Sequence, residues 1–243
     1  ENCKKYNSKL HILGLVSDGG VHSHMRHLFA ILEFAKRKDF ENVYVHCFMD
    51  GRDTPPTSGK EYLCELEEEL RNIGVGESYI AKLEEKMKEK GVGKIATIEG
   101  RFYAMDRDKR WNRVKEAYDA IVNGVGEKAT TALSAIEASY QKEVFDEFVK
   151  PTVICNGETP VATIEENDSV IFFNFRPDRA RELTRTLVDK DFNEFDTKKM
   201  NLFFVCFTQY DETMPNVKIA FKPESLVNTF GEYISNNGLK QLR

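Results

Sequence analysis

The sequence lacks a long apolar run, a paired-cysteine motif and an excess of positive charge. No segment approaches the roughly 18 consecutive apolar residues of a membrane-spanning helix, so a membrane protein is not expected. The five cysteines are odd in number and form no CxxC pair, which argues against a disulfide framework and a zinc site. The formal charge of −5 argues against a nucleic-acid surface, which usually shows a clustered excess of lysine and arginine.

The first residues, Glu1 to Lys5, contain neither an apolar signal core nor an initiator methionine. We therefore expect a trimmed, cytoplasmic protein, and a monomer. A chain of 243 residues with 41 % apolar residues is long enough to bury one sizeable core. The expectation is a single domain spanning residues 1–243.

Short apolar runs rich in Val, Ile and Phe alternate with segments of helical spacing. Runs of this kind suit strands buried on both faces of a parallel sheet: Leu10 to Val16, Val43 to Met49, Lys94 to Ile98, Val170 to Phe175 and Leu202 to Phe207. The alternation predicts an α/β fold, a doubly wound and mostly parallel sheet with helices on both faces. The less regular stretch from Val125 to Val161 is predicted to hold two helices, Ala129 to Gln141 and Val144 to Val149.

One segment occurs twice, as YLCELEEELRNIGVG at 62–76 and YIAKLEEKMKEKGVG at 79–93, an offset of 17 residues. Two copies are too few for a solenoid, so this is a local duplication, whether natural or not. A crossover between neighbouring parallel strands needs only one helix. The first copy is predicted to be that helix, because Ile73 extends its apolar face where the second copy has Lys90. The second copy is predicted to be an additional, more exposed helix.

Polar groups follow four of the predicted strands at the point where each strand ends. In an open α/β sheet the ligand binds outside the carboxyl ends of the strands. An arginine follows three of these strands and a histidine the fourth, and the fixed fork of arginine donors suits carboxylate and phosphate. The sequence therefore predicts a cage for a small anion, built from GLVSDGGVHSH (14–24), DGRDTPP (50–56), EGR (99–101) and NFRPDR (174–179).

Each of these residues has a plainer interpretation when it is considered alone. His22 or His24 would ordinarily cap a helix or lie at the surface, and their spacing would also suit metal, which we discount because no further cluster supports it. Asp53 would be a turn residue and Asp178 a residue at a helix N-terminus. A solvated helix face would account for Arg107, Arg110 and Arg113. Their coincidence at strand ends favours a site.

Four strings, in their order and spacing, resemble the central domain of cofactor-independent phosphoglycerate mutases. They are GLVSDGGVHSH (14–24), DGRDTPP (50–56), GRFYAMDRDKRW (100–111) and NFRPDRA (174–180), and the resemblance covers nearly the whole chain. It implies a glycolytic isomerase that interconverts 3-phosphoglycerate and 2-phosphoglycerate. The substrate-binding and catalytic positions implied by the resemblance are His22, Arg52, Asp53, Arg101, Arg107, Arg176 and Arg179.

The resemblance also implies a role for each kind of residue. The arginines are expected around the substrate carboxylate and phosphate, with His22 donating to the phosphate and Arg52 pairing with the glycerate. Asp53, a carboxylate beside these cations, should stay ionised and exchange protons with the two hydroxyls. Which arginine binds which group of the substrate is left open.

The family's second domain carries two manganese ions and a serine nucleophile, and its motifs have no counterpart in these residues. We therefore expect no metal in this chain, the missing domain as its partner in cis, and no turnover by the chain alone. Two alternatives stay open. One is a non-catalytic binding module for phosphorylated metabolites, and the other is a structural insert whose arginines are paired and scattered.

Overall fold

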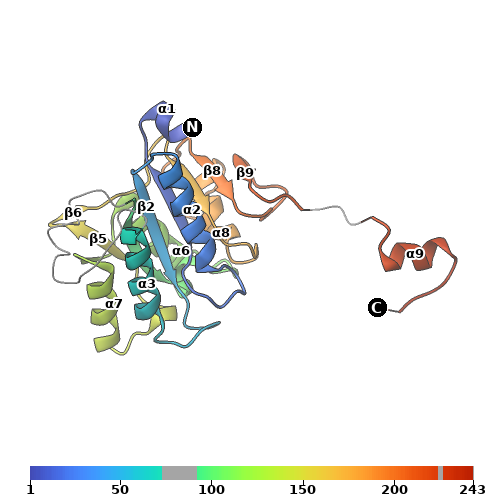
Figure 1. Cartoon of the computed structure of the whole chain (residues 1–243), viewed down its shortest axis with the longest axis horizontal. Coiled ribbons are helices and arrows are strands. Elements are labelled where there is room, and N and C mark those ends of the chain that lie inside the picture. Colours follow the sequence, from blue (N-terminus) through green and yellow to red (C-terminus); the bar gives the residue numbers. More distant parts are fainter. Residues whose placement is uncertain (73–91, 224–226, 243) are drawn as a thin grey trace.

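The computed structural model describes residues 1–72, 92–223 and 227–242. Across these residues the strands form one nine-stranded sheet in the order β4-β5-β3-β2-β1-β7-β8-β9, with β6 paired to β5 (Figure 1). The strands are β1 (Leu10–Leu15), β2 (Val43–Met49), β3 (Lys94–Gly100), β4 (Glu127–Ala129), β5 (Thr152–Asn156), β6 (Thr159–Pro160), β7 (Ser169–Phe172), β8 (Phe203–Cys206) and β9 (Val217–Ile219).

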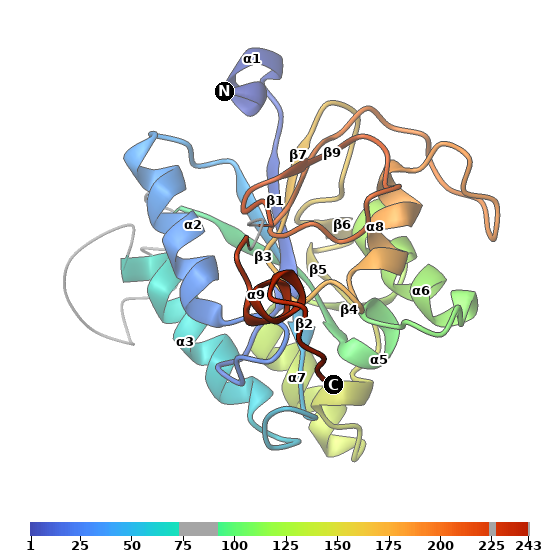
Figure 2. The ribbon, with the colours of Figure 1, turned by 90° about the vertical axis from the view of Figure 1, so that its right-hand side faces the viewer.

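Helices cover both faces of the sheet, as Figure 2 shows. One apolar core lies under α2 (Met25–Arg37), α3 (Gly59–Asn72) and α7 (Ala132–Gln141). The second lies on the opposite face under α5 (Arg101–Ala104), α6 (Trp111–Tyr118) and α8 (Arg181–Val188). Shorter turns are α1 (Asn2–Tyr6), the π-helical turn η2 (Asp119–Asn123) and the 3₁₀ turn η3 (Asp146–Phe148). The predicted doubly wound, mostly parallel α/β sheet is confirmed.

The strand pairings explain why the apolar runs in the sequence predicted parallel strands. Strands β3, β2, β1, β7, β8 and β9 run parallel in succession, and a strand buried on both faces reads as a continuous apolar run. Strand β5 pairs antiparallel with β3 through Thr97↔Val153 and was not predicted. The predicted helix from Val144 to Val149 is wrong, because only the 3₁₀ turn η3 forms there.

The repeat is described only in part, since residues 73–91 lie outside the described residues. Helix α3 contains most of the first copy, and its Leu63, Leu66 and Leu70 are buried in the core. This confirms that the first copy supplies the crossover helix between β2 and β3. The prediction for the second copy lies outside the described residues, apart from its last two positions, Val92 and Gly93.

A row of buried polar side chains crosses the centre of the sheet. His11 Nε2 lies 3.1 Å from Asp168 Oδ2, and His11 Nδ1 lies 2.9 Å from His46 Nε2. His46 Nδ1 lies 3.0 Å from Thr97 Oγ1. Burial lowers the pKa of both imidazoles, so both rings are neutral and each supplies one donor and one acceptor. Asp168 directly precedes β7, His11 is the second residue of β1, and His46 and Thr97 lie in the middle of β2 and β3.

Helix α9 (Phe230–Asn236) lies away from the sheet in Figure 1. A capping box at Thr229 begins this helix, and none of its residues is buried. Phe230 and Tyr233 are among its exposed apolar side chains. Within the described residues, no helix combines the length and apolar character needed to span a membrane.

Candidate anion-binding site

The site lies at the carboxyl ends of four neighbouring parallel strands. The loops that follow β1, β2, β3 and β7 carry the residues that the sequence singled out. Because these strands are adjacent and parallel, their carboxyl ends meet at one edge of the sheet. The structure therefore brings together His22, Arg52, Asp53, Arg101, Arg107, Arg176 and Arg179, through the contacts described below.

Arg101 is the buried anchor of the site, with a side chain that is 3 % exposed. Its Nη1 donates to Asp50 Oδ1 at 2.7 Å and to Asp53 Oδ2 at 2.6 Å. Burial opposes its charge, but the hydrogen bonds to Asp53 and Asp50 outweigh burial and raise the pKa of Arg101. The guanidinium thereby fixes the loop after β2 against the end of β3.

Asp50 organises the loop after β2 and was missed by the sequence analysis. Its Oδ1 accepts hydrogen bonds from the backbone amides of Arg52 and Asp53, and its Oδ2 accepts one from Ser17 Oγ at 2.7 Å. Burial would raise the pKa of Asp50, but these hydrogen bonds and Arg101 lower it. Its position directly after a buried strand, at the start of DGRDTPP, was the signal available in the sequence.

His22 lies between two carboxylates and is 3 % exposed. Its Nε2 is 3.9 Å from Asp53 Oδ2, and its Nδ1 is 3.6 Å from Asp178 Oδ1. The His22 carbonyl accepts hydrogen bonds from the amides of Phe175 at 2.8 Å and Arg176 at 3.2 Å, which joins the loops after β1 and β7. Burial, and next the charge of Arg101, lowers the pKa of His22 to about 4, so the ring is neutral near pH 7.

Asp178 holds two of the arginines in place. Arg107 Nη1 donates to its Oδ2 at 2.9 Å, and Arg176 Nη2 donates to the same oxygen at 3.1 Å. Burial opposes ionisation of Asp178, but Arg107 and Arg176 outweigh burial and lower its pKa. Both arginine side chains are close to half exposed, so they are accessible from solvent.

Arg179 differs from Arg101, Arg107 and Arg176 in its hydrogen-bond partner, which is a backbone carbonyl and not a carboxylate. Its Nη1 donates to the Met105 carbonyl at 3.0 Å, and in the described part of the chain it forms no ion pair with a carboxylate. Burial lowers the pKa of Arg179, and the positive charges of Arg107, Arg101 and Arg52 lower it further. Four guanidinium groups therefore lie close enough to repel one another, an arrangement that a bound anion stabilises.

The turn η3 packs against the loops after β2 and β3, which carry Arg52 and Arg101. Arg52 Nη1 donates to Glu147 Oε1 at 3.2 Å. A Cβ atom on Gly100 would lie 2.1 Å from the Glu147 carbonyl, and one on Gly51, whose φ is +65°, would lie 2.9 Å from the Glu147 amide. Both glycines are therefore required where the two site loops meet the turn.

The plainer interpretations hold for some residues and not for others. His24 is the N-cap of α2, and its side chain accepts from the Arg26 amide. Arg110 pairs with Asp106 and Asp108, and Arg113 stacks over the Phe102 ring at 3.7 Å. Asp178 is not a helix cap, since α8 begins after Ala180. The arginines of a purely structural insert would be scattered, and the convergence on Arg179 disagrees with that alternative.

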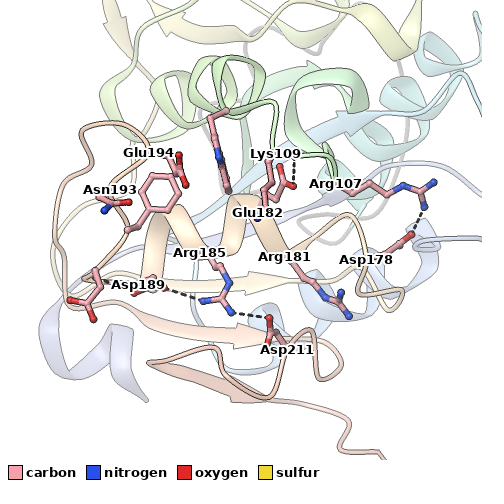
Figure 3. Close-up of a pocket in the computed structure, with 13 residues that line it drawn as sticks. Arg107, Lys109, Asp178, Arg181, Glu182, Arg185, Asp189, Asn193, Glu194 and Asp211 are labelled. Carbon is pink, nitrogen blue, oxygen red and sulfur yellow. Dashed lines mark hydrogen bonds and ion pairs between the residues drawn. The ribbon is translucent and has the colours of Figure 1, made fainter.

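A surface pocket of about 450 Å³ adjoins the site and shares Arg107 and Asp178 with it (Figure 3). Its other side is formed by Trp111, Phe192 and the first turns of α8, including Glu182.

The described residues contain no group of three or more His, Cys, Asp or Glu side chains that could hold a metal ion.

The fold and the site define an α/β domain that presents converging arginines at the carboxyl ends of its strands. A family model described as the N-terminus of BPG-independent phosphoglycerate mutase matches residues 1–78 and 74–212. The chain belongs to this family, the 2,3-bisphosphoglycerate-independent phosphoglycerate mutases.

Several named members are close relatives. The chain is similar to the 2,3-bisphosphoglycerate-independent phosphoglycerate mutase of Acetivibrio thermocellus, 59 % identical over 245 residues, covering 100 % of this chain and 45 % of the relative. The enzyme of the same name from Clostridium perfringens is 54 % identical, with 100 % and 44 % covered. A crystal structure of Leishmania mexicana phosphoglycerate mutase superposes with a TM-score of 0.81 at 31 % identity, covering 95 % of this chain and 41 % of that chain. The chain thus spans less than half the length of these relatives.

Proposed function

We propose that this chain is the substrate-binding part of an isomerase, a cofactor-independent phosphoglycerate mutase that interconverts 3-phosphoglycerate and 2-phosphoglycerate in glycolysis and gluconeogenesis. The observation that carries the proposal is the contact network at the strand ends, in which Arg101 binds Asp53, His22 lies between Asp53 and Asp178, and Asp178 binds Arg107 and Arg176. Guanidinium groups bind carboxylate and phosphate with paired donors. A phosphoglycerate offers one of each on a three-carbon skeleton, which suits a cluster of several arginines better than a single-anion site.

The described contacts divide the arginines by task. Arg107 and Arg176 are close to half exposed and Arg179 is partly exposed, and these three are proposed to bind the carboxylate and phosphate. Arg101 is buried against Asp50 and Asp53, so it contributes charge and positions Asp53. Arg52 is more than half exposed and is proposed to pair with the glycerate.

Asp53 and His22 are the proposed catalytic groups of this chain, together with Arg52. Asp53 Oδ2 lies between Arg101 Nη1 at 2.6 Å and His22 Nε2 at 3.9 Å. A carboxylate in this place accepts the proton of the hydroxyl that takes up the phosphoryl group, and returns it to the hydroxyl that has released one. His22, as a neutral ring, donates one hydrogen bond to the phosphate. The arginines hold the glycerate between these two steps.

The rest of the reaction is proposed to lie in the remainder of the protein, the partner of this chain in cis. That part would supply the serine nucleophile and two manganese ions, which clamp a transferring phosphoryl group. The described residues of this chain contain no group of three or more His, Cys, Asp or Glu side chains that could form such a metal site. We further propose that the protein is a cytoplasmic monomer and that residues 1–243 form one domain.

Calorimetric titration of the chain with 3-phosphoglycerate tests this function. We expect saturable binding that weakens with salt, because the contacts are ionic, and no interconversion of phosphoglycerates with or without manganese. Absence of binding at low ionic strength would refute the proposed substrate. Turnover by the pure chain that scales with its concentration would show that the nucleophile lies within these residues.

A further inference from the structure

Two buried carboxyl groups that are not among the proposed catalytic residues contact the loop that carries Arg107. Asp106 is 4 % exposed and Glu182, in the first turn of α8, is 8 % exposed. Both accept hydrogen bonds from one short loop, Asp106 from the amides of Asp108 and Arg110 and Glu182 from the amide of Lys109 between them, so the two carboxyl groups are neighbours. Two ionised carboxylates in this position repel each other and cannot hydrogen-bond to each other, because neither has a proton to donate.

The pair holds the backbone of the loop that carries Arg107. Asp106 Oδ2 accepts from the amides of Asp108 and Arg110, both at 2.9 Å. Glu182 Oε1 accepts from the amide of Lys109 at 2.9 Å (Figure 3). Lys109 has φ +58°, a left-handed conformation that a non-glycine residue keeps only where its surroundings enforce it.

Glu182 Oε2 is buried and has no hydrogen-bond partner among the described residues. A proton on this oxygen makes it a donor to Asp106 and leaves Oε1 free to accept from Lys109. Arg110 and Arg113 stabilise the charge of Asp106 through its Oδ1, which assigns the proton to Glu182. The other charged groups around the pair are Asp108 in the loop and Lys109, Arg181 and Arg185 along the adjoining pocket.

We propose that Asp106 and Glu182 share one proton, and that this protonated pair positions Arg107 for anion binding. The inference rests on the proposed function, since Arg107 is there a substrate-binding residue. Glu182 is a positioning residue that acts through the Lys109 amide. Loss of the shared proton places two negative charges together and releases the loop.

The electrostatics agree with this geometry. Burial, and then the neighbouring charge of Asp106, raises the pKa of Glu182 to about 7, whereas hydrogen bonds to backbone amides and Arg110 outweigh burial and lower that of Asp106. The proton is therefore present at pH 6 and absent at pH 8. If the protonated pair is needed for binding, affinity falls about tenfold between these values.

Chemical-shift titrations of the 243-residue chain from pH 6 to 8.5 test the shared proton without ligand. We expect the amides of Asp108, Lys109 and Arg110 to shift together with a midpoint near pH 7 in the unmodified chain. E182Q keeps a donor and an acceptor but cannot titrate, so the shifts should disappear. E194Q is the control, because Glu194 lines the same pocket and is exposed. Loop amides that shift equally in E182Q would overturn the proposal.

The affinity for 3-phosphoglycerate gives a second readout. The ligand's own titration affects every variant alike, so the ratio of the affinities of unmodified chain and E182Q isolates the pair. We expect that ratio to fall about tenfold from pH 6 to pH 8, and D106N to bind without this dependence, as E182Q does. A constant ratio would refute the link to Arg107. If the loop amides titrate while no variant binds phosphoglycerate at any pH, the shared proton stands and the proposed function fails.

Discussion

His22 Nδ1 and Asp178 Oδ1 face each other at 3.6 Å, and neither atom has a hydrogen-bond partner among the described residues, although Arg176 Nε is 3.1 Å from the same oxygen. The gap is too long for a hydrogen bond. Both atoms are therefore buried polar groups whose hydrogen-bonding capacity is unused in this structure.

The first prediction concerns the protonation of His22. Its pKa is lowered to about 4 by burial and Arg101, so its ring resonances should not titrate between pH 5.5 and 8. Folding then disfavours the imidazolium, and His22 costs stability progressively as pH falls from its ordinary 6.5 toward 4. Added phosphoglycerate should raise this pKa, because a nearby anion stabilises the charged ring. Proton NMR would measure both, and a midpoint near 6.5 in the free chain would contradict the assignment.

The second prediction separates binding from stability at Arg176 and Arg179. Replacing both by alanine should abolish phosphoglycerate binding and leave the melting temperature nearly unchanged. Arg176 contributes an exposed pair with Asp178, worth at most about 1 kcal/mol, and removing Arg179 relieves repulsion from its neighbours. Arg185→Ala is the control, since Arg185 pairs with Asp189 and Asp211; it should lower stability slightly and leave binding intact. The opposite pattern would favour a structural insert.

The third prediction compares two aspartates bound to one arginine. Asp50→Ala should lower the free energy of unfolding by about 3–5 kcal/mol, because it removes the buried partner of Arg101. Asp53→Asn should cost far less, since Asp53 is partly exposed and Asp50 still neutralises Arg101. Urea denaturation would measure both. Equal losses would show that Asp53 is structural and would weaken its proposed catalytic role.

The fourth prediction uses the repeat. Deleting residues 77–93 joins Gly76 to Lys94 and should leave a folded chain that keeps its phosphoglycerate affinity, because α3 already packs the first copy against the sheet. Deleting residues 60–76 instead also leaves one copy, with Lys90 in place of Ile73, and should be less stable. Thermal melting and calorimetry would rank the two. An insoluble product of the first deletion would show that both copies belong to the core.

The sequence predicted which residues meet at the strand ends because its signals are local. Each arginine of the cluster follows a buried strand by at most seven residues, and parallel strands bring such positions to one edge. What the sequence did not reveal depends on distant partners. Arg101 became an internal anchor only because Asp50 lies beneath it, and the meeting of Asp106 with Glu182 joins two loops far apart in the chain. Strand β5 was missed because its antiparallel pairing with β3 leaves no distinctive pattern.

The polar row through His11, His46 and Thr97 fixes the alignment of the strands that carry the site. Apolar residues on both faces of β1 and β2 would pack nearly as well after a slip of two residues, because side chains alternate with that period. The three hydrogen bonds of the row exist in a single alignment. Any slip would bury polar groups without partners, at a cost that apolar packing does not recover. The two histidines therefore disfavour other strand registers. They align the ends of β1, β2 and β3, so that the loops carrying His22, Arg52 and Arg101 lie next to one another.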